Sequence, residues 1–196
     1  LSLADVDTGK IANGPLIVGV LAIATLWLAT VLNFGGARIT GRLSTGTIWG
    51  VIIPVVGISI IGWFWFDPQM WAHAWNPHHL DSFTAISSSI SMTLWAFLGI
   101  ESASANSDSV ENPERNVPIA VMGGCIGAAV LYVLSTNVMF GITGYQELAN
   151  SNGPFGLVFS EMLNPVAGKF VLVLMVISCF GSLLAWQFTI AQVARS

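Results

Sequence analysis

Five long runs without a charged side chain constrain this chain more than any other feature of its sequence. They cover residues 11–37, 43–66, 82–100, 116–146 and 170–194 of the 196 residues. A helix that crosses the hydrocarbon core of a bilayer needs about 20 mostly apolar residues. Charged residues make up only 8% of this chain, whereas they make up about a quarter of a typical soluble domain. The sequence therefore predicts an all-α polytopic membrane protein with five transmembrane helices.

The predicted helices lie at about 15–34, 46–66, 83–106, 118–142 and 166–192. Pro15, Pro118 and Pro165 suit the first turn of a helix, because the N–H that proline lacks would have no partner there. Gly123 and Gly127 are small residues spaced four apart, which indicates a surface where another helix comes close.

The positive charges are distributed unevenly among the connections. One side of the predicted membrane has Arg38, Arg42, Arg115 and Arg195, and the other has only Lys10 and Lys169. Because positive residues concentrate in cytoplasmic loops, we expect the arginine side to be cytoplasmic. The connection 67–82 is then external, and nearby tryptophans form an aromatic belt at the membrane surface: Trp63, Trp65, Trp71 and Trp75.

Several other functions are not supported by the composition. Cys125 and Cys179 lie inside predicted helices, so neither a disulfide nor a metal site is expected. The histidines at 73, 78 and 79 lie in a watery connection without cysteine partners, and we expect no metal and no cofactor. A net charge of −4 shared among the loops indicates no nucleic-acid partner.

Two classes of membrane protein are less compatible with the sequence. An intramembrane hydrolase would need a base beside a serine, and no predicted helix contains a histidine, so we do not expect an enzyme. A structural or channel subunit stays open as an alternative. Channels conduct without a counter-substrate, so uptake stimulated by cargo on the opposite side would exclude it.

The third predicted helix contains a carboxylate in an apolar run. Glu101 follows Gly99 by two residues and Trp95 by six, in the sequence WAFLGIES. An ionisable residue inside the membrane is unfavourable by roughly 2.5–3.5 kcal/mol unless it lines a cavity in the protein. On a continuous helix Trp95 and Glu101 would lie about 120° apart. We therefore expect a break between Leu98 and Ser102, which brings them to one site and frees backbone groups as ligands, as in secondary transporters.

Two interpretations of Glu101 stay open. It can bind a cation or carry a coupling proton, or it can only cap the lower half-helix, since carboxylates are favoured at helix N-termini. The fifth predicted helix has a weaker signal, in which Gln187 follows Trp186 and Gln192 lies on another face. Two indoles and one carboxylate would form a suitable box for an organic cation, although Trp186 is equally compatible with packing.

Several segments are specific enough to indicate a family. NFGGARITGR, TLWAFLGIESASANSDSVENPERNVPIAVMGG and GSLLAWQFTIAQV resemble the basic amino acid/polyamine antiporter group of the amino acid–polyamine–organocation superfamily. The resemblance implies twelve spans, of which the first ten form two inverted five-helix repeats. This chain is similar to spans four to eight. Both ends are therefore expected to be cut, and residues 1–196 to be part of a transporter's transmembrane domain.

The resemblance also implies site residues and an activity. The family's substrate-contacting aromatic residues fall on Trp95 and Trp186, its acidic residue on Glu101, and the helix break on Gly99. A basic residue implicated in handling the carboxylate of an amino acid falls on Arg195, where the putrescine member carries Lys.

The implied activity is exchange of putrescine for ornithine across a bacterial cytoplasmic (inner) membrane, with proton-coupled putrescine uptake as a further mode. Arginine–agmatine and lysine–cadaverine exchange are the alternatives. The expected partners are small-molecule polyamines, amino acids and the lipid bilayer. The sequence leaves a homo-oligomer open.

Overall fold

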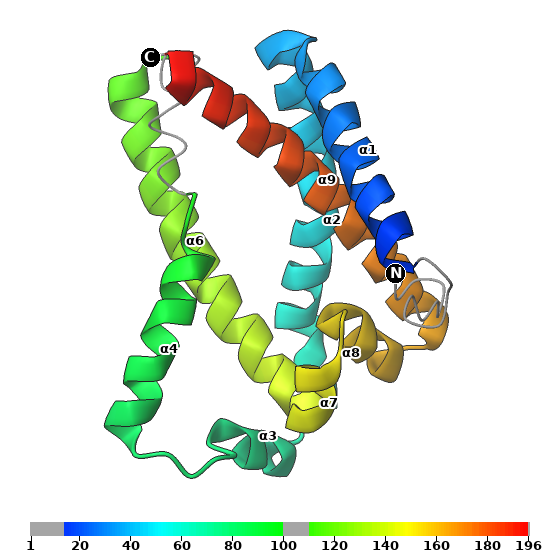
Figure 1. Cartoon of the computed structure of the whole chain (residues 1–196). Coiled ribbons are helices and arrows are strands. Elements are labelled where there is room, and N and C mark those ends of the chain that lie inside the picture. Colours follow the sequence, from blue (N-terminus) through cyan, green and yellow to red (C-terminus); the bar gives the residue numbers. More distant parts are fainter. Residues whose placement is uncertain (1–13, 100–109, 196) are drawn as a thin grey trace. The chain divides into compact units, whose positions relative to one another are not determined.

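The computed structural model describes residues 14–99 and 110–195, and all regular structure in these residues is helical (Figure 1). In chain order the elements are α1 (Gly14–Asn33), α2 (Gly36–Ile61), η2 (Gly62–Trp65), α3 (Pro68–Trp75), α4 (Ser82–Ala96), α6 (Pro113–Ile142), α7 (Tyr145–Asn150), α8 (Pro154–Met162) and α9 (Pro165–Arg195). One compact unit comprises Leu1–Pro54 and Asn150–Ser196, and a second comprises Val55–Ala149.

Within the described residues, four helical segments are long and apolar enough to cross a membrane. They are Pro15–Asn33, Arg38–Trp65, Pro113–Ile142 and Pro165–Ala194. They correspond to the first, second, fourth and fifth predicted helices and confirm an all-helical chain with several candidate spans. The third predicted helix is described only as far as residue 99, and its helical part is the 15-residue α4.

The second predicted helix begins earlier than the sequence indicated. The chain turns after α1, and Gly36 has a φ of 77°, a backbone angle that favours glycine. α2 then starts at once, so Arg38 and Arg42 lie on the helix and the prediction of a loop there was wrong. The start of α2 was missed because hydropathy marks only the apolar part of a helix, whereas arginine is polar and yet a good helix former.

The fourth predicted helix also begins early. α6 starts with Pro113 in its first turn, and Pro118 lies inside the helix, so the prediction that Pro118 opens it was wrong. The N–H groups of Arg115 and Asn116 already donate to the carbonyl oxygen of Asn112, which establishes the helix before Pro118 is reached. The predictions for Pro15 and Pro165 are confirmed, since they are the second residue of α1 and the first of α9.

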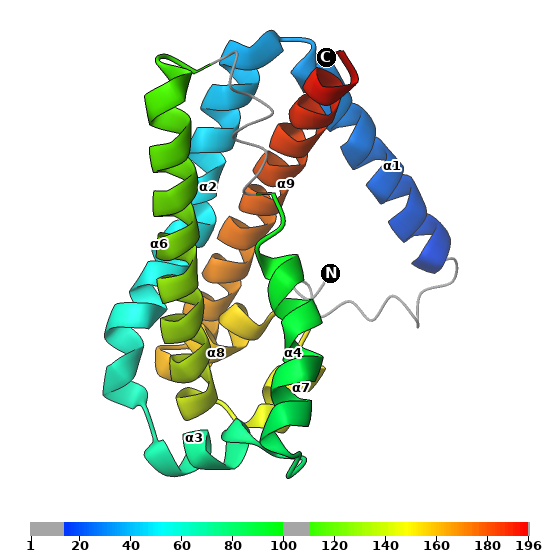
Figure 2. The same ribbon diagram turned by 90° about the vertical axis from the view of Figure 1, so that its left-hand side faces the viewer.

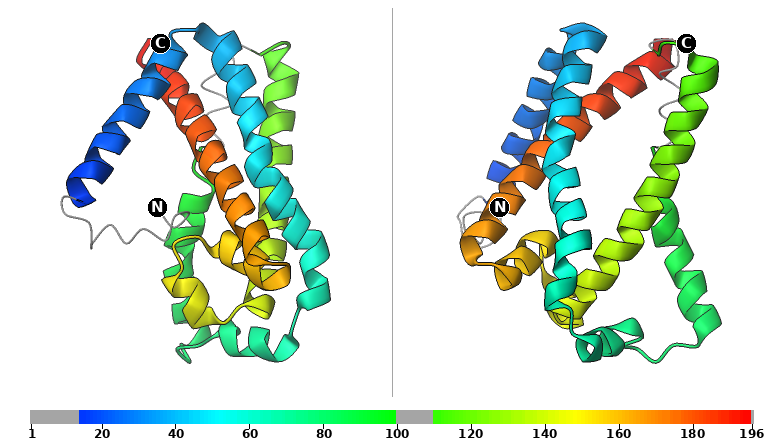
Figure 3. Two further views of the ribbon diagram at one scale, coloured as in Figure 1. Left: turned by 90° about the vertical axis from the view of Figure 1, so that its right-hand side faces the viewer. Right: turned by 180° about the vertical axis from the view of Figure 1, so that it is seen from behind.

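In the first unit, α9 packs against α1 and α8 (Figure 3) and crosses α2 at very short range. A Cβ atom added to Gly50 would lie 2.5 Å from the carbonyl oxygen of Leu174 and 2.6 Å from Ser178 Oγ. The Ser178 hydroxyl donates to the carbonyl oxygen of Thr47, and Gly181 lies against the Thr47 side chain. Small residues that let two backbones approach closely are typical of helix contacts in membranes.

The close helix contact predicted at Gly123 and Gly127 is not seen among residues 14–99 and 110–195. No described atom lies within 4 Å of a Cβ placed on either residue. Spacing alone therefore did not identify the close crossing, because a small-residue pair becomes a contact only when another helix lies over it.

We expect Gly50→Ala to destabilise the protein by about 1–3 kcal/mol, because its methyl group would press on a backbone carbonyl that cannot move alone. Gly46→Ala is the matched control, since it lies on the same helix with open space around its Cβ. Thermal unfolding of the detergent-solubilised variants measures the difference. Equal stability of the two variants would contradict the close crossing.

In the second unit, α3 and the preceding residues are fixed to α6 (Figure 2). Trp71 Nε1 donates to Asn137 Oδ1 at 2.9 Å, and the N–H of Asp67 donates to the carbonyl oxygen of Gly141 at 2.7 Å. The Asp67 side chain caps α3 by accepting from the Gln69 N–H at 2.8 Å. The predicted belt residue Trp71 thus has a structural role that the sequence did not indicate.

Candidate functional site

The helix that carries Trp95 ends close to the predicted break. α4 stops at Ala96, and the N–H groups of Phe97 and Leu98 donate to the carbonyl oxygens of Leu94 (3.1 Å) and Trp95 (3.3 Å). These three-residue bonds tighten the last turn, as is common where a helix ends.

Gly99 follows this turn with a φ of 101°, which a residue with a side chain rarely adopts. The helix therefore ends at Ala96, before the predicted break at 98–102, and it is not continuous through Gly99. Glu101 lies outside the described residues, and the second half-helix stays a prediction.

Trp95 lies on the last turn of α4 with 76% of its surface exposed in this chain. Several hydroxyl groups of the same helix donate to the helix's own backbone. Ser88 donates to the carbonyl oxygen of Ala85 at 3.0 Å, and Thr93 donates to that of Ser89 at 2.9 Å. The polarity that the sequence showed in this helix thus needs no water-filled cavity, whereas the exposed indole stays available for another contact.

Tyr132, which the sequence analysis missed, contacts the end of α4 from α6. Its hydroxyl donates to the carbonyl oxygen of Ala96 at 3.0 Å, and its ring meets the Phe97 ring edge to face at a centroid distance of 5.6 Å. One signal could have identified it, because it is one of only two tyrosines in the chain and lies inside an apolar run.

Trp186 and its neighbour Gln187 point to different faces of α9. Trp186 is 42% exposed. Gln187 Oε1 instead accepts from Asn33 Nδ2 at 3.2 Å, and Asn33 Oδ1 accepts from the Thr40 hydroxyl at 2.8 Å. Gln187 therefore joins α9 to the end of α1, while Trp186 stays partly accessible.

The predicted site residues are divided between the two units. Trp95 and Gly99 lie at the end of α4 in the second unit, next to Tyr132. Trp186 belongs to the first unit, as does Arg195, the last residue of α9. The predicted box of two indoles and one carboxylate, and the role of Arg195, stay predictions.

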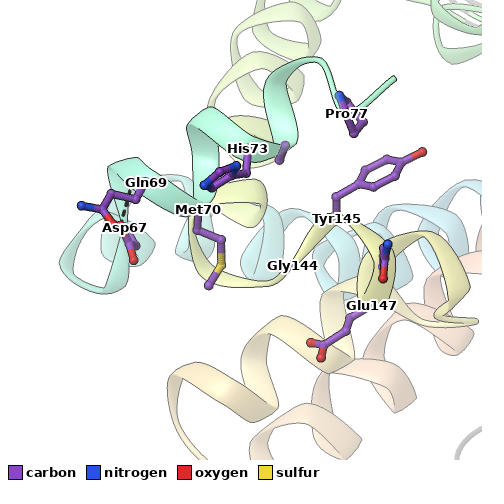
Figure 4. A pocket seen from close by; sticks show the side chains of 10 residues that line it. Asp67, Gln69, Met70, His73, Pro77, Gly144, Tyr145 and Glu147 are labelled. Atoms are coloured by element: carbon purple, nitrogen blue, oxygen red, sulfur yellow. Dashed lines mark hydrogen bonds between the residues drawn. The ribbon is translucent and has the colours of Figure 1, made fainter. Parts of the chain in front are cut away.

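A separate cavity of about 650 Å³ lies in the second unit between α3 and the start of α7 (Figure 4). Its lining includes Asp67, His73, Tyr145 and Glu147. The Tyr145 hydroxyl lies 3.2 Å from His78 Nε2, and the two rings meet edge to face. Trp95 and Gly99 do not line this cavity, so it is distinct from the end of α4. In the described ranges, no three His, Cys, Asp or Glu side chains are grouped to hold a metal ion.

The described residues contain several apolar helices long enough to cross a membrane. One further helix, α4, ends beside Gly99 and the exposed indole of Trp95. Helices interrupted near a glycine are typical of membrane transporters. The family model for amino acid permeases matches residues 1–196, and the chain belongs to this family. This confirms the resemblance that the sequence motifs indicated.

Curated relatives refine the comparison. Putrescine transporter PotE of Haemophilus influenzae is 67% identical over 182 residues, which are 93% of this chain and 42% of the relative. Putrescine transporter PotE of Escherichia coli K12 is 64% identical over the same shares of both chains. The Cadaverine/lysine antiporter of Escherichia coli K12 is 36% identical over 93% of this chain and 41% of its own length. The chain thus spans about two fifths of the length of these relatives.

Proposed function

We propose that this chain is part of a secondary transporter that exchanges putrescine for ornithine across the bacterial cytoplasmic membrane. The observation that carries the proposal is the difference in identity, 64–67% to putrescine transporters against 36% to a cadaverine/lysine antiporter. In this proposal the chain comprises five membrane helices, spans four to eight of a five-plus-five inverted-repeat fold. Its third span is the predicted helix at 83–106, which lies partly outside the described residues.

The proposed mechanism follows from the charges of the two cargoes. Putrescine is a dication and ornithine a monocation at neutral pH, and each must lose water at the membrane midplane. The exposed indoles of Trp95 and Trp186 can replace part of that water, with cation–π contributions of about 0.5–2 kcal/mol per contact. Glu101 supplies the opposite charge, and Arg195 is proposed to meet the carboxylate of ornithine.

In this proposal the helix break that follows α4, which ends at Ala96, divides the site between two half-helices. A broken helix near the midplane presents backbone groups to the cargo and can change shape without disturbing the longer helices. Bound cargo then permits the interconversion of outward-open and inward-open states, whereas the empty carrier interconverts poorly, so that cargo is exchanged.

We expect liposomes that contain the full-length transporter and are loaded with ornithine to accumulate labelled putrescine, whereas liposomes without internal cargo take up far less. A panel of internal cargoes, namely ornithine, lysine and arginine, tests the choice of partner. The same liposomes are also tested with labelled cadaverine outside, and faster uptake of cadaverine against internal lysine than of putrescine against internal ornithine would favour a cadaverine/lysine antiporter. Uptake that does not depend on internal cargo would contradict an exchanger and indicate a channel.

A further inference from the structure

We propose that Tyr132 is a positioning residue that holds the end of α4, and with it Trp95, in the geometry that binds cargo. The inference rests on the proposed function of Trp95. Its structural basis is the hydrogen bond from the Tyr132 hydroxyl to the carbonyl oxygen of Ala96, at 3.0 Å.

The need for such a contact follows from the way a helix ends. The last four carbonyl groups of a helix have no N–H partner within it, and in hydrocarbon an unpaired carbonyl is strongly unfavourable. Here Leu94 and Trp95 accept from the two N–H groups that follow the helix. The carbonyl of Ala96 accepts from a side chain of another helix, so the position of this last turn depends on α6.

Tyr132 is well placed to fix this turn. It lies well inside the length of α6, a helix of 30 residues in the same unit as α4. Its ring lies edge to face against Phe97 with an interplanar angle of 82°, so ring and hydroxyl hold two consecutive residues at the end of α4. Trp95 immediately precedes Ala96. Tyr132 therefore fixes the orientation of the Trp95 indole without needing to contact the cargo itself.

Tyr132→Phe tests the role of the hydroxyl, because it keeps the ring contact with Phe97 and removes only the oxygen. We expect the Kd for putrescine, measured on the full-length protein, to rise about three- to tenfold, as for the loss of one hydrogen bond. Tyr145→Phe is the matched control. It removes the chain's other tyrosine hydroxyl, which pairs with His78 away from α4, and should leave the Kd unchanged.

A second measurement reports the geometry directly. We expect a spin label at Leu98, in a background without other cysteines, to become more mobile when Tyr132→Phe is added. A label at Ser89, earlier on α4, should not change. An unchanged Kd together with an unchanged label at Leu98 would overturn the proposal, as would an equal effect of Tyr145→Phe on the Kd.

The two measurements also separate this inference from the proposed function. If the wild-type protein does not bind putrescine, the proposed function fails. The label at Leu98 still shows whether Tyr132 holds the end of α4, because its mobility does not depend on the identity of the cargo.

Discussion

Glu101→Gln in the full-length transporter should reduce putrescine–ornithine exchange by about tenfold or more. The amide keeps the size of the side chain but removes the negative charge that is proposed to face a desolvated cation. Removing one partner of such a charge pair is unfavourable by about 2–5 kcal/mol. Glu147→Gln is a suitable control, since Glu147 is exposed on α7 and lies near neither Gly99 nor Trp95 in the sequence.

The pH dependence of exchange separates the two interpretations of Glu101. If its carboxylate carries a coupling proton, the activity that remains in Glu101→Gln should lose much of its pH dependence. The measurement is a pH series of exchange at matched protein levels for wild type, Glu101→Gln and Glu147→Gln. A rate and a pH profile that both equal those of the wild type would show that Glu101 only caps a half-helix.

Trp95→Leu and Trp186→Leu should each weaken putrescine binding about two- to thirtyfold, which corresponds to the loss of one cation–π contact. Leucine keeps an apolar side chain of moderate size, so a loss of affinity reports the ring rather than hydrophobicity. Titration calorimetry on the full-length protein measures the effect.

The structure determines the control for this experiment. Trp71 was expected only to anchor the membrane surface, but its indole bonds to Asn137 and holds α3 on α6. Trp75 is 71% exposed and packs its ring on Trp71 at a centroid distance of 5.1 Å, which makes Trp75→Leu the milder change. If all three leucine variants bind putrescine equally well, Trp95 and Trp186 do not contact cargo.

The sequence alone determined the helical class and the approximate place of most membrane spans. In a bilayer every backbone polar group must find a partner inside the protein, so an apolar run of about 20 residues has essentially one regular structure available. This is why α1 and α9 match their predictions within a few residues. The end of α4 was also predictable from the local sequence, because Gly99 adopts a backbone angle that few other residues accept.

Hydropathy was less informative at the polar ends of helices. It marked the apolar parts of α2 and α6 but not their first turns, where Arg38 and Pro113 are compatible with helix although they are not apolar. In the candidate site, the sequence indicated Trp95 and Gly99 because a carboxylate in an apolar run can be recognised without a structure, and their binding role stays a prediction.

Only the tertiary structure decided which side chains meet. Gly50 rather than Gly123 lies at a close helix crossing, and Gln187 bonds to Asn33 across more than 150 residues. Tyr132 reaches the carbonyl oxygen of Ala96 from another helix. A local pattern records the composition of one helix, whereas a contact depends on the distance and rotation between two, and these arise only when the helices pack.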